Sequence, residues 1–375
     1  MGAIILAASL VSLKLGLSVA IIEMLFGALG GSIGLHVQDW MAYLSGFGGI
    51  TLTFLAGTEI DTTLLKEKFK ESFLIGFFSF LAPFVVVAGY TYFVAHWGLR
   101  ASLLAGTALS CTSLAVVYSV LVETGMGSTQ VGKLLMASTF VTDMGTALAL
   151  SILFVKPTLY SLVFILISII VIVFATKFSH LVFDSPRLKN KVVEPEIKYL
   201  FLLLLAFMYF AQLGEGQAVM PAFILGLLMS PHFRETAGTK SVRDKLRTVA
   251  YAIITPVFFI VGGMNVSFPV VLSALALFLI LLGLKLAGKF VGVFFLSKRF
   301  IPRGAMYTTL LMSTGLTFGT IAAVFGLNAG IINQVQYSLL VGVIIASAAI
   351  PTFIAQKWFA PRHSEDIVEL NENGR

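Results

Sequence analysis

Residues 106–115 have the sequence GTALSCTSLA and lie in the middle of an apolar run that extends from 101 to 123. A second stretch of this kind, MSTGLTFGTIAA at 312–323, lies inside the apolar run 303–326. Ser, Thr and Gly are weak helix formers, and a helix interrupted by them exposes carbonyl groups at one end and N–H groups at the other. Small-residue helix packing would explain either stretch alone. Two interruptions in comparable places predict two discontinuous helices, one in each of two inverted structural repeats.

The composition places the whole chain in a membrane. Of its 375 residues, 58% are hydrophobic and 11% are charged, whereas soluble domains carry about 25% charged residues. The single cysteine, Cys111, excludes an intramolecular disulfide framework and a cysteine-cluster metal site. A net charge of +7 would permit nucleic-acid binding, but the basic residues lie in short loops between apolar runs. That placement indicates control of membrane topology, and we expect no nucleic-acid partner.

A hydrocarbon core about 30 Å thick requires about 20 apolar residues per helix, and this criterion predicts an all-α polytopic membrane protein. The thirteen expected spans are 2–13, 15–35, 41–58, 72–95, 101–123, 131–154, 158–180, 197–213, 217–230, 249–265, 268–296, 303–326 and 335–359. The first run is short, and twelve spans remain possible. With the N-terminus outside, the outer loops hold only Arg100 and Lys156, and nearly all other Lys and Arg residues face the cytoplasm. The C-terminus is then cytoplasmic.

An acidic residue lies deep in the sixth span. Asp143, in STFVTDMGTALALS (138–151), is about twelve residues from either end of 131–154, or about 18 Å of helix rise. Placing an Asp at the centre of a spanning helix costs roughly 2.5–3.5 kcal/mol on insertion scales. A structural Asp bonded to a neighbouring helix is one explanation. An ion pathway is the more favoured one, because such residues usually face a protein interior or a wet cavity.

Two lysines lie in another span, in LLGLKLAGKFVG (281–292). Lys285 and Lys289 are four residues apart and therefore lie on one helical face. Glycines 283, 288 and 292 are expected to let a neighbouring helix approach closely. Snorkelling toward the inner headgroups is the alternative, more plausible for Lys289 than for Lys285.

Taken together, several stretches resemble the monovalent cation:proton antiporter-2 family of the cation:proton antiporter superfamily. They cover residues 14–330 in the order of that family: KLGLSVAIIEMLFGALGGSIG, FLAGTEID, GTALSCTSLAVVYSVL, STFVTDMGTALAL, LAGKFVG and MSTGLTFGTIAAVFGLNAG. The resemblance implies a thirteen-helix protomer, two crossing discontinuous helices at 101–123 and 303–326, and a homodimer in a cell membrane, with a prokaryotic origin expected. It makes Asp143 the ion-binding aspartate and Lys289 the basic residue that faces it.

The resemblance also implies a division of the chain. Residues 1–60 would hold N-terminal scaffold or dimerisation spans, and 158–265 a linker helix and further scaffold spans. The ion-transporting core would consist of 72–154 and 268–359, followed by a short cytoplasmic tail at 360–375.

Two positions depart from the family pattern. Many electrogenic members carry two adjacent acids where this chain has Thr142–Asp143, and members with a neutral first residue include electroneutral exchangers and potassium carriers. A basic–Gly–acidic triplet is often found where this chain has Thr314–Gly315–Leu316. Na⁺ therefore cannot be assumed, although we favour it.

The function expected from these residues is electroneutral exchange of a monovalent cation for H⁺, serving pH homeostasis. A carboxylate binds a proton or a small cation, and the two compete for Asp143, the one expected ligand of Na⁺ or K⁺. Thr142, Thr112 and Ser113 could add oxygen ligands, which suit hard cations. The basic residues Lys289 and Lys285 are expected to tune the site, with Lys289 adjusting Asp143 or capping carbonyls of the break that contains Thr314, Gly315 and Thr317.

K⁺/H⁺ exchange is the main alternative, and no cofactor beyond the transported ions is expected. A cation channel would use Asp143 as a selectivity charge. A Na⁺-coupled organic-anion symporter would need more basic residues around the crossing. An enzyme is least favoured, because the sequence offers no nucleophile–base pair or metal cluster.

Overall fold

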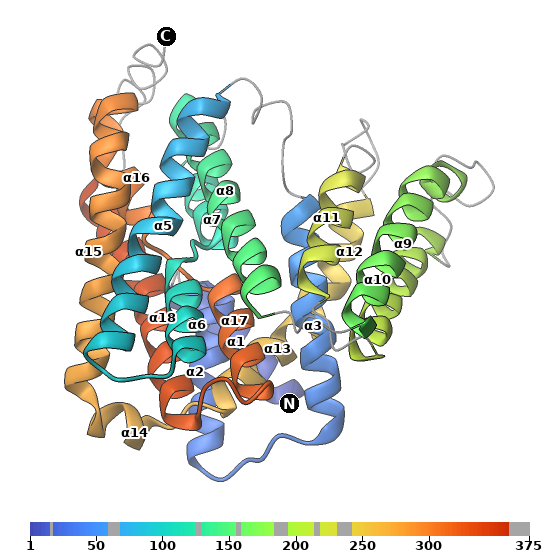
Figure 1. The fold of residues 1–375 in the computed structure, drawn as a ribbon, viewed down its shortest axis with the longest axis horizontal. Coiled ribbons are helices and arrows are strands. Elements are labelled where there is room, and N and C mark those ends of the chain that lie inside the picture. Colours follow the sequence, from blue (N-terminus) through green and yellow to red (C-terminus); the bar gives the residue numbers. More distant parts are fainter. Residues whose placement is uncertain are drawn as a thin grey trace. The chain divides into compact units, whose positions relative to one another are not determined.

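The computed structural model describes residues 1–15, 18–58, 68–124, 126, 129–154, 159–183, 194–213, 218–230 and 242–359. Every regular element in these ranges is a helix (Figure 1). This is the expected all-α architecture, since a helix satisfies all its backbone hydrogen bonds internally in lipid. The expected tail at 360–375 lies outside the described residues.

The helices follow the apolar runs of the sequence. Their bounds are α1 (Gly2–Leu15), α2 (Val19–Ser32), α3 (Asp39–Thr58), α5 (Phe69–Phe93), α6 (Leu99–Ser110), α7 (Leu114–Glu123), α8 (Gln130–Leu153), α9 (Leu159–Phe183), α10 (Pro195–Leu213), α11 (Val219–Met229), α12 (Val242–Val249), α13 (Thr255–Met264), α14 (Phe268–Ser273), α15 (Leu275–Phe300), α16 (Ala305–Met312), α17 (Thr317–Asn328) and α18 (Gln334–Ile354). Short π or 3₁₀ turns are η2 (Ala250–Ile254), η3 (Pro302–Gly304) and η4 (Ala355–Phe359).

Eight helical stretches of the described chain are long and apolar enough to cross a membrane. Three shorter apolar helices, α1, α2 and α11, add to them. Each expected span overlaps one of the helices or helix pairs above. The number of thirteen crossings itself stays a prediction, because several helices are shorter than a full span.

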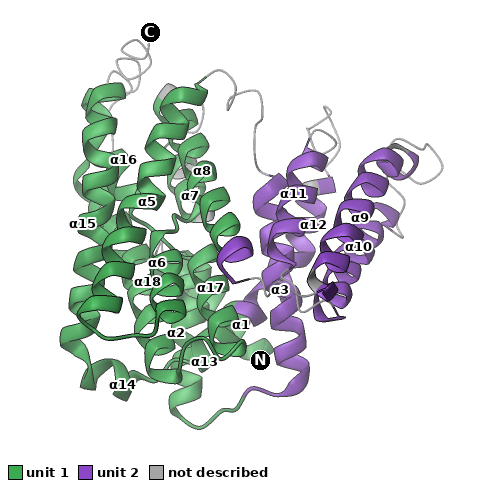
Figure 2. Cartoon of the chain, in the orientation of Figure 1, with its two compact units in different colours: residues 1–36, 61–149, 259–375 green, residues 37–60, 150–258 purple. Residues whose placement is uncertain are grey.

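The helices form two compact units, coloured separately in Figure 2. Unit 1 comprises Met1–His36, Asp61–Ala149 and Phe259–Arg375, and unit 2 comprises Val37–Ile60 and Leu150–Phe258. Both expected core segments lie mainly in unit 1. Residues 1–36, which we expected with the scaffold, are grouped with unit 1, while their contribution to a dimer interface stays a prediction.

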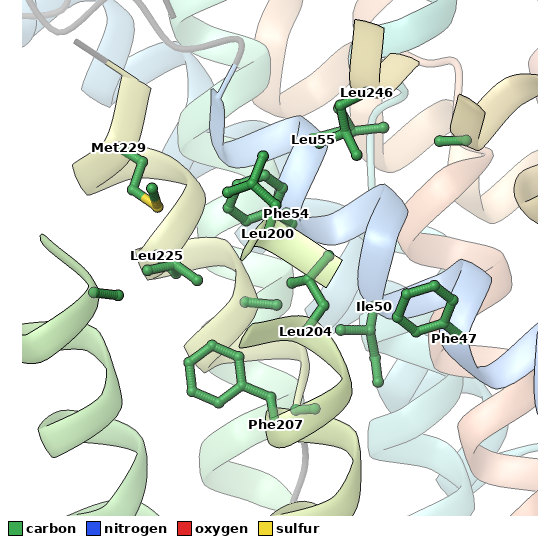
Figure 3. Close-up of a cluster of buried hydrophobic side chains, with 14 of the residues drawn as sticks. Phe47, Ile50, Phe54, Leu55, Leu200, Leu204, Phe207, Leu225, Met229 and Leu246 are labelled. Carbon is green, nitrogen blue, oxygen red and sulfur yellow. The ribbon is translucent and has the colours of Figure 1, made fainter. Parts of the chain in front are cut away.

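Unit 2 has an apolar core built largely from α3, α9, α10 and α11, part of which is drawn in Figure 3. Phe54 of α3 and Phe207 of α10 are fully buried in it. Glycines on both α3 and α11 permit close packing, since a Cβ at Gly57 would collide with the Phe223 carbonyl oxygen. Small residues at such interfaces let helix backbones approach one another in membranes.

Unit 1 contains two halves with the same sequence of elements: a long helix, a broken pair and another long helix. The first half is α5, α6–α7 and α8, and the second is α15, α16–α17 and α18. Gly288 of α15 packs on Pro83 of α5, and Gly292 packs on Phe78. Residue numbers rise along one helix as they fall along the other, so the two helices are antiparallel. Equivalent helices of inverted repeats have this relationship.

Candidate ion-binding site

Both predicted interruptions are present. Helix α6 ends at Ser110 and α7 begins at Leu114, while α16 ends at Met312 and α17 begins at Thr317. We call residues 111–113 the first break and residues 313–316 the second break. Both breaks are rich in Ser, Thr and Gly, residue types whose side chains compete for backbone hydrogen bonds or whose backbone is flexible.

The two breaks contact each other. The Ser113 N–H donates to the Thr314 carbonyl at 2.9 Å, and the Thr112 hydroxyl donates to the Met312 carbonyl at 2.9 Å. These bonds satisfy backbone groups that the broken helices leave open. The two discontinuous helices therefore meet at their interruptions.

Lys289 extends from α15 into the first break. Its side chain is fully buried, and Nζ donates to Ser79 Oγ of α5 and to Thr112 Oγ1, both at 2.9 Å. Snorkelling is therefore wrong for this residue. Among the described residues, Nζ bonds to these two hydroxyl groups rather than to carbonyls of 314–320. The Thr112 hydroxyl in turn donates a hydrogen bond to the Met312 carbonyl.

Lys285 is equally buried, one helical turn earlier on α15. Its Nζ has no hydrogen-bond partner among the described residues. A Cβ built on Gly315 would collide with this Nζ, so the amine lies in the space that Gly315 leaves open. Lys285 thus contacts the second break, and it does not snorkel either.

Asp143 lies on α8 with 2% of its surface exposed. One turn earlier on the same helix, Thr139 Oγ1 is 3.3 Å from Met312 Sδ, so this part of α8 packs on the end of α16. Met312 also accepts the hydrogen bond of Thr112, so this part of α8 and the first break meet at the same residue, and the Asp143 carboxylate interacts electrostatically with Lys289 and Cys111. The acid, the lysine and the first break therefore form one buried cluster in unit 1.

Thr142 faces another neighbour. Its hydroxyl donates to the Gly76 carbonyl of α5 and to the Ser138 carbonyl of α8, both at 3.1 Å. This hydroxyl joins α8 to α5 in the structure. Its oxygen retains acceptor capacity, and its proposed role as a cation ligand stays a prediction.

The other expected site residues lie within or beside the breaks. Ser113 Oγ accepts the Val116 N–H at 3.4 Å, at the start of α7. Thr314 Oγ1 donates to the Leu311 carbonyl at 2.7 Å, and Thr317 begins α17 with little exposure. The hydroxyl groups of Ser113 and Thr314 therefore bond to the local backbone.

Sequence reasoning missed Ser79, which accepts a hydrogen bond from the buried lysine. A single serine in the apolar run FFSFLAP carries no signal of its own. The packing of Gly288 and Gly292 on α5 brings this serine to Lys289. Gly283, which we expected to share that role, has no neighbouring atom within 4 Å of its Cβ position.

Comparison with known proteins agrees with this architecture. The family model described as the transmembrane region of sodium/hydrogen exchangers matches residues 2–359. The chain is 28% identical over 366 residues to the probable Na⁺/H⁺ antiporter 3 of Methanocaldococcus jannaschii, covering 92% of this chain and 90% of the relative. It is 26% identical over 374 residues to the Na⁺/H⁺ antiporter of Enterococcus hirae, covering 94% of each.

A solved structure shares the fold. The sodium proton antiporter MjNhaP1 from Methanocaldococcus jannaschii, determined at pH 8, aligns with a TM-score of 0.69 at 16% identity, covering 96% of this chain and 98% of that one. The matched family is a transporter family and not an enzyme class. Its match to nearly the whole chain, over helices long enough to span a bilayer, confirms the resemblance found in the sequence. The chain is therefore a multi-pass membrane protein that belongs to the sodium/hydrogen exchanger family.

Proposed function

We propose that the protein exchanges a monovalent cation, with Na⁺ favoured, for H⁺ by competition at Asp143. The observation that carries the proposal is a buried carboxylate on α8, a helix that packs on the end of α16, together with two helix breaks that contact each other. A proton and a cation at one carboxylate exclude one another, because either one neutralises it. Alternating exposure of such a site to the two sides of the membrane converts this competition into exchange.

The charges near the breaks support electroneutral exchange. Among the buried acidic residues of the described chain, only Asp143 lies in the two repeats; Glu23 lies on α2 and Glu196 on α10. A bare carboxylate is disfavoured in a low-dielectric site, so the loaded forms move more readily than the empty one. One carboxylate takes up one H⁺ or one monovalent cation, and each cycle then moves no net charge.

Oxygen atoms around the carboxylate would complete the cation site. We assign this role to Thr112, Ser113 and Thr142 together with carbonyl groups of the breaks, since alkali cations prefer oxygen ligands. Thr112 Oγ1 already accepts a hydrogen bond from Lys289. We propose that Lys289 keeps Thr112 oriented and adjusts the charge at Asp143 without carrying a transported proton.

Proton flux in proteoliposomes tests the proposal directly. Purified protein is reconstituted with an internal pH-sensitive dye, and Na⁺, K⁺ and Li⁺ are offered separately. We expect cation-driven proton flux that Asp143→Asn abolishes, and the cation panel decides between Na⁺/H⁺ and K⁺/H⁺ exchange. Asp39→Asn is the matched control, because Asp39 is an exposed acid in the first turn of α3. Normal exchange by Asp143→Asn would remove the site assignment.

Two further readouts separate the alternatives. The KM for the cation should rise as pH falls, by up to about tenfold per pH unit, since one proton competes for one carboxylate. Clamping the membrane potential should leave the exchange rate unchanged. Cation flux without a coupled proton would indicate a channel, and proton-independent uptake of an organic anion would indicate a symporter.

Assembly and orientation belong to the same proposal. We infer a homodimer in a prokaryotic cell membrane with the N-terminus outside and the C-terminus in the cytoplasm. The distribution of Lys and Arg over the loops supports the orientation. An impermeant label directed at an N-terminal tag should react in intact cells, and light scattering of the solubilised protein should give twice the mass of one chain.

A further inference from the structure

The Lys285 side chain fills the space next to Gly315 that a side chain at position 315 would otherwise occupy. Gly315 lies in the second break, and a Cβ added to it would collide with Lys285 Nζ. The same Cβ would lie 2.9 Å from both the carbonyl oxygen and the thiol sulfur of Cys111, which is the first residue of the first break. Three elements therefore meet at this point: α15 and the two breaks.

The contact combines shape with charge. Lys285 is fully buried, and its Nζ has no hydrogen-bond partner among the residues that the structure describes, so its burial is costly unless nearby oxygen dipoles favour it. The Cys111 carbonyl follows the last residue of α6, where a helix C-terminus carries partial negative charge. An ammonium attracted to this end of α6 and fitted into the gap at Gly315 would hold both breaks against α15.

We propose that Lys285 and Gly315 form an interlocked pair that positions the two breaks around Asp143. The proposal rests on the exchange reaction proposed above and adds a positioning residue to it. Lys289 bonds to Thr112 on the first break, and Lys285 fills the second, so successive turns of α15 fix one break each. A change at position 285 or 315 then alters the geometry of the cation site without touching the carboxylate.

A double-mutant cycle tests the interlock. Gly315→Ala places a methyl group where Nζ lies, and Lys285→Ala removes that Nζ. We expect Gly315→Ala to raise the KM for the cation, and to raise it less when Lys285→Ala is also present. The expected coupling is about tenfold, or about 1.4 kcal/mol. Additive effects of the two substitutions would overturn the proposal.

Gly319→Ala is the matched control. Its added Cβ would lie 2.7 Å from Cys111 Sγ and 2.8 Å from the Ala108 carbonyl oxygen, and Lys285 is not among the three nearest atoms. Loss of exchange in this variant should therefore persist in the Lys285→Ala background. Equal rescue of both glycine variants would show general loosening of the fold and would contradict a specific pair.

A second measurement does not depend on transport. Cys111 is the only cysteine of the chain and is buried beside the same gap. Removing the Lys285 side chain should give a small methanethiosulfonate reagent access to the thiol, so Lys285→Ala should label at least about tenfold faster than Lys285→Met, which also lacks the charge but keeps an apolar side chain in the gap. Adding Gly315→Ala should slow the labelling again by refilling the gap. Unchanged labelling would overturn the interlock.

The two proposals can fail separately. Normal exchange by Asp143→Asn would remove the site at Asp143, while the labelling experiment would still decide whether Lys285 fills the gap at Gly315. Conversely, Asp143→Asn could abolish exchange while the KM effects of the substitutions at 285 and 315 are additive. That outcome would support the proposed exchange at Asp143 and reject the interlock.

Discussion

Packing between α5 and α15 should control exchange from a distance, and Gly288→Ala tests this. A Cβ at Gly288 would lie 2.6 Å from Pro83 Cα, where ordinary contacts begin at 3.4 Å. The two helices must therefore separate by about 0.8 Å locally. Gly283→Ala is the control on the same helix, because no atom of a neighbouring helix in the described chain lies within 4 Å of its Cβ position.

The separation acts on the buried lysine. Lys289 is the residue after Gly288, and its Nζ reaches Ser79 of α5 across the same interface at 2.9 Å. Moving α5 away by about 0.8 Å would lengthen this contact beyond about 3.5 Å, where a hydrogen bond is lost. Misplacement on this scale can reduce a rate by up to about 100-fold. We therefore expect the exchange rate of Gly288→Ala to fall by about tenfold or more.

Stability should separate the two variants as well. Replacing Gly by Ala inside a helix stabilises the folded protein by about 1 kcal/mol through backbone entropy, and both variants share this gain. Overpacking at Gly288 should lower the free energy of unfolding by about 1–3 kcal/mol. The difference in stability between Gly288→Ala and Gly283→Ala therefore measures this overpacking. Thermal unfolding in detergent and proton flux in liposomes are the assays. Equal exchange rates for Gly288→Ala and Gly283→Ala would refute the reasoning.

Three further substitutions probe single interactions. Thr142→Val removes the hydrogen bond to the Gly76 carbonyl and should destabilise the protein by about 1–3 kcal/mol; an unchanged KM for the cation would show that the hydroxyl serves packing and is no ligand. Tyr337→Phe removes a 2.6 Å bond from α18 to a carbonyl of α13, and a loss of about 1–3 kcal/mol should appear in thermal unfolding with the fold retained. Glu194→Gln breaks a partly exposed ion pair with Lys245, and stability should fall by less than about 1 kcal/mol, with the difference shrinking at high salt.

The sequence alone predicted the elements of the site. The interruptions at 106–115 and 312–323 were evident because Ser, Thr and Gly stand out within apolar runs, and α6–α7 and α16–α17 do break there. Asp143 was evident because a carboxylate in lipid is costly. These signals are local. Each depends on the type of residue and on its position along an apolar run, and the sequence gives both directly.

The tertiary structure decided which side chains meet. Ser79 meets Lys289 because glycines of α15 let α5 approach, and Lys285 reaches the second break because Gly315 has no side chain. Likewise, Thr142 turns its hydroxyl to α5 although its neighbour in sequence, Asp143, is the proposed ion-binding residue. The helical period fixes which residues share a face, but the neighbour that a face contacts depends on how helices distant in sequence pack. For this reason the chain alone specifies the breaks and the buried acid, and only the folded protein specifies their partners.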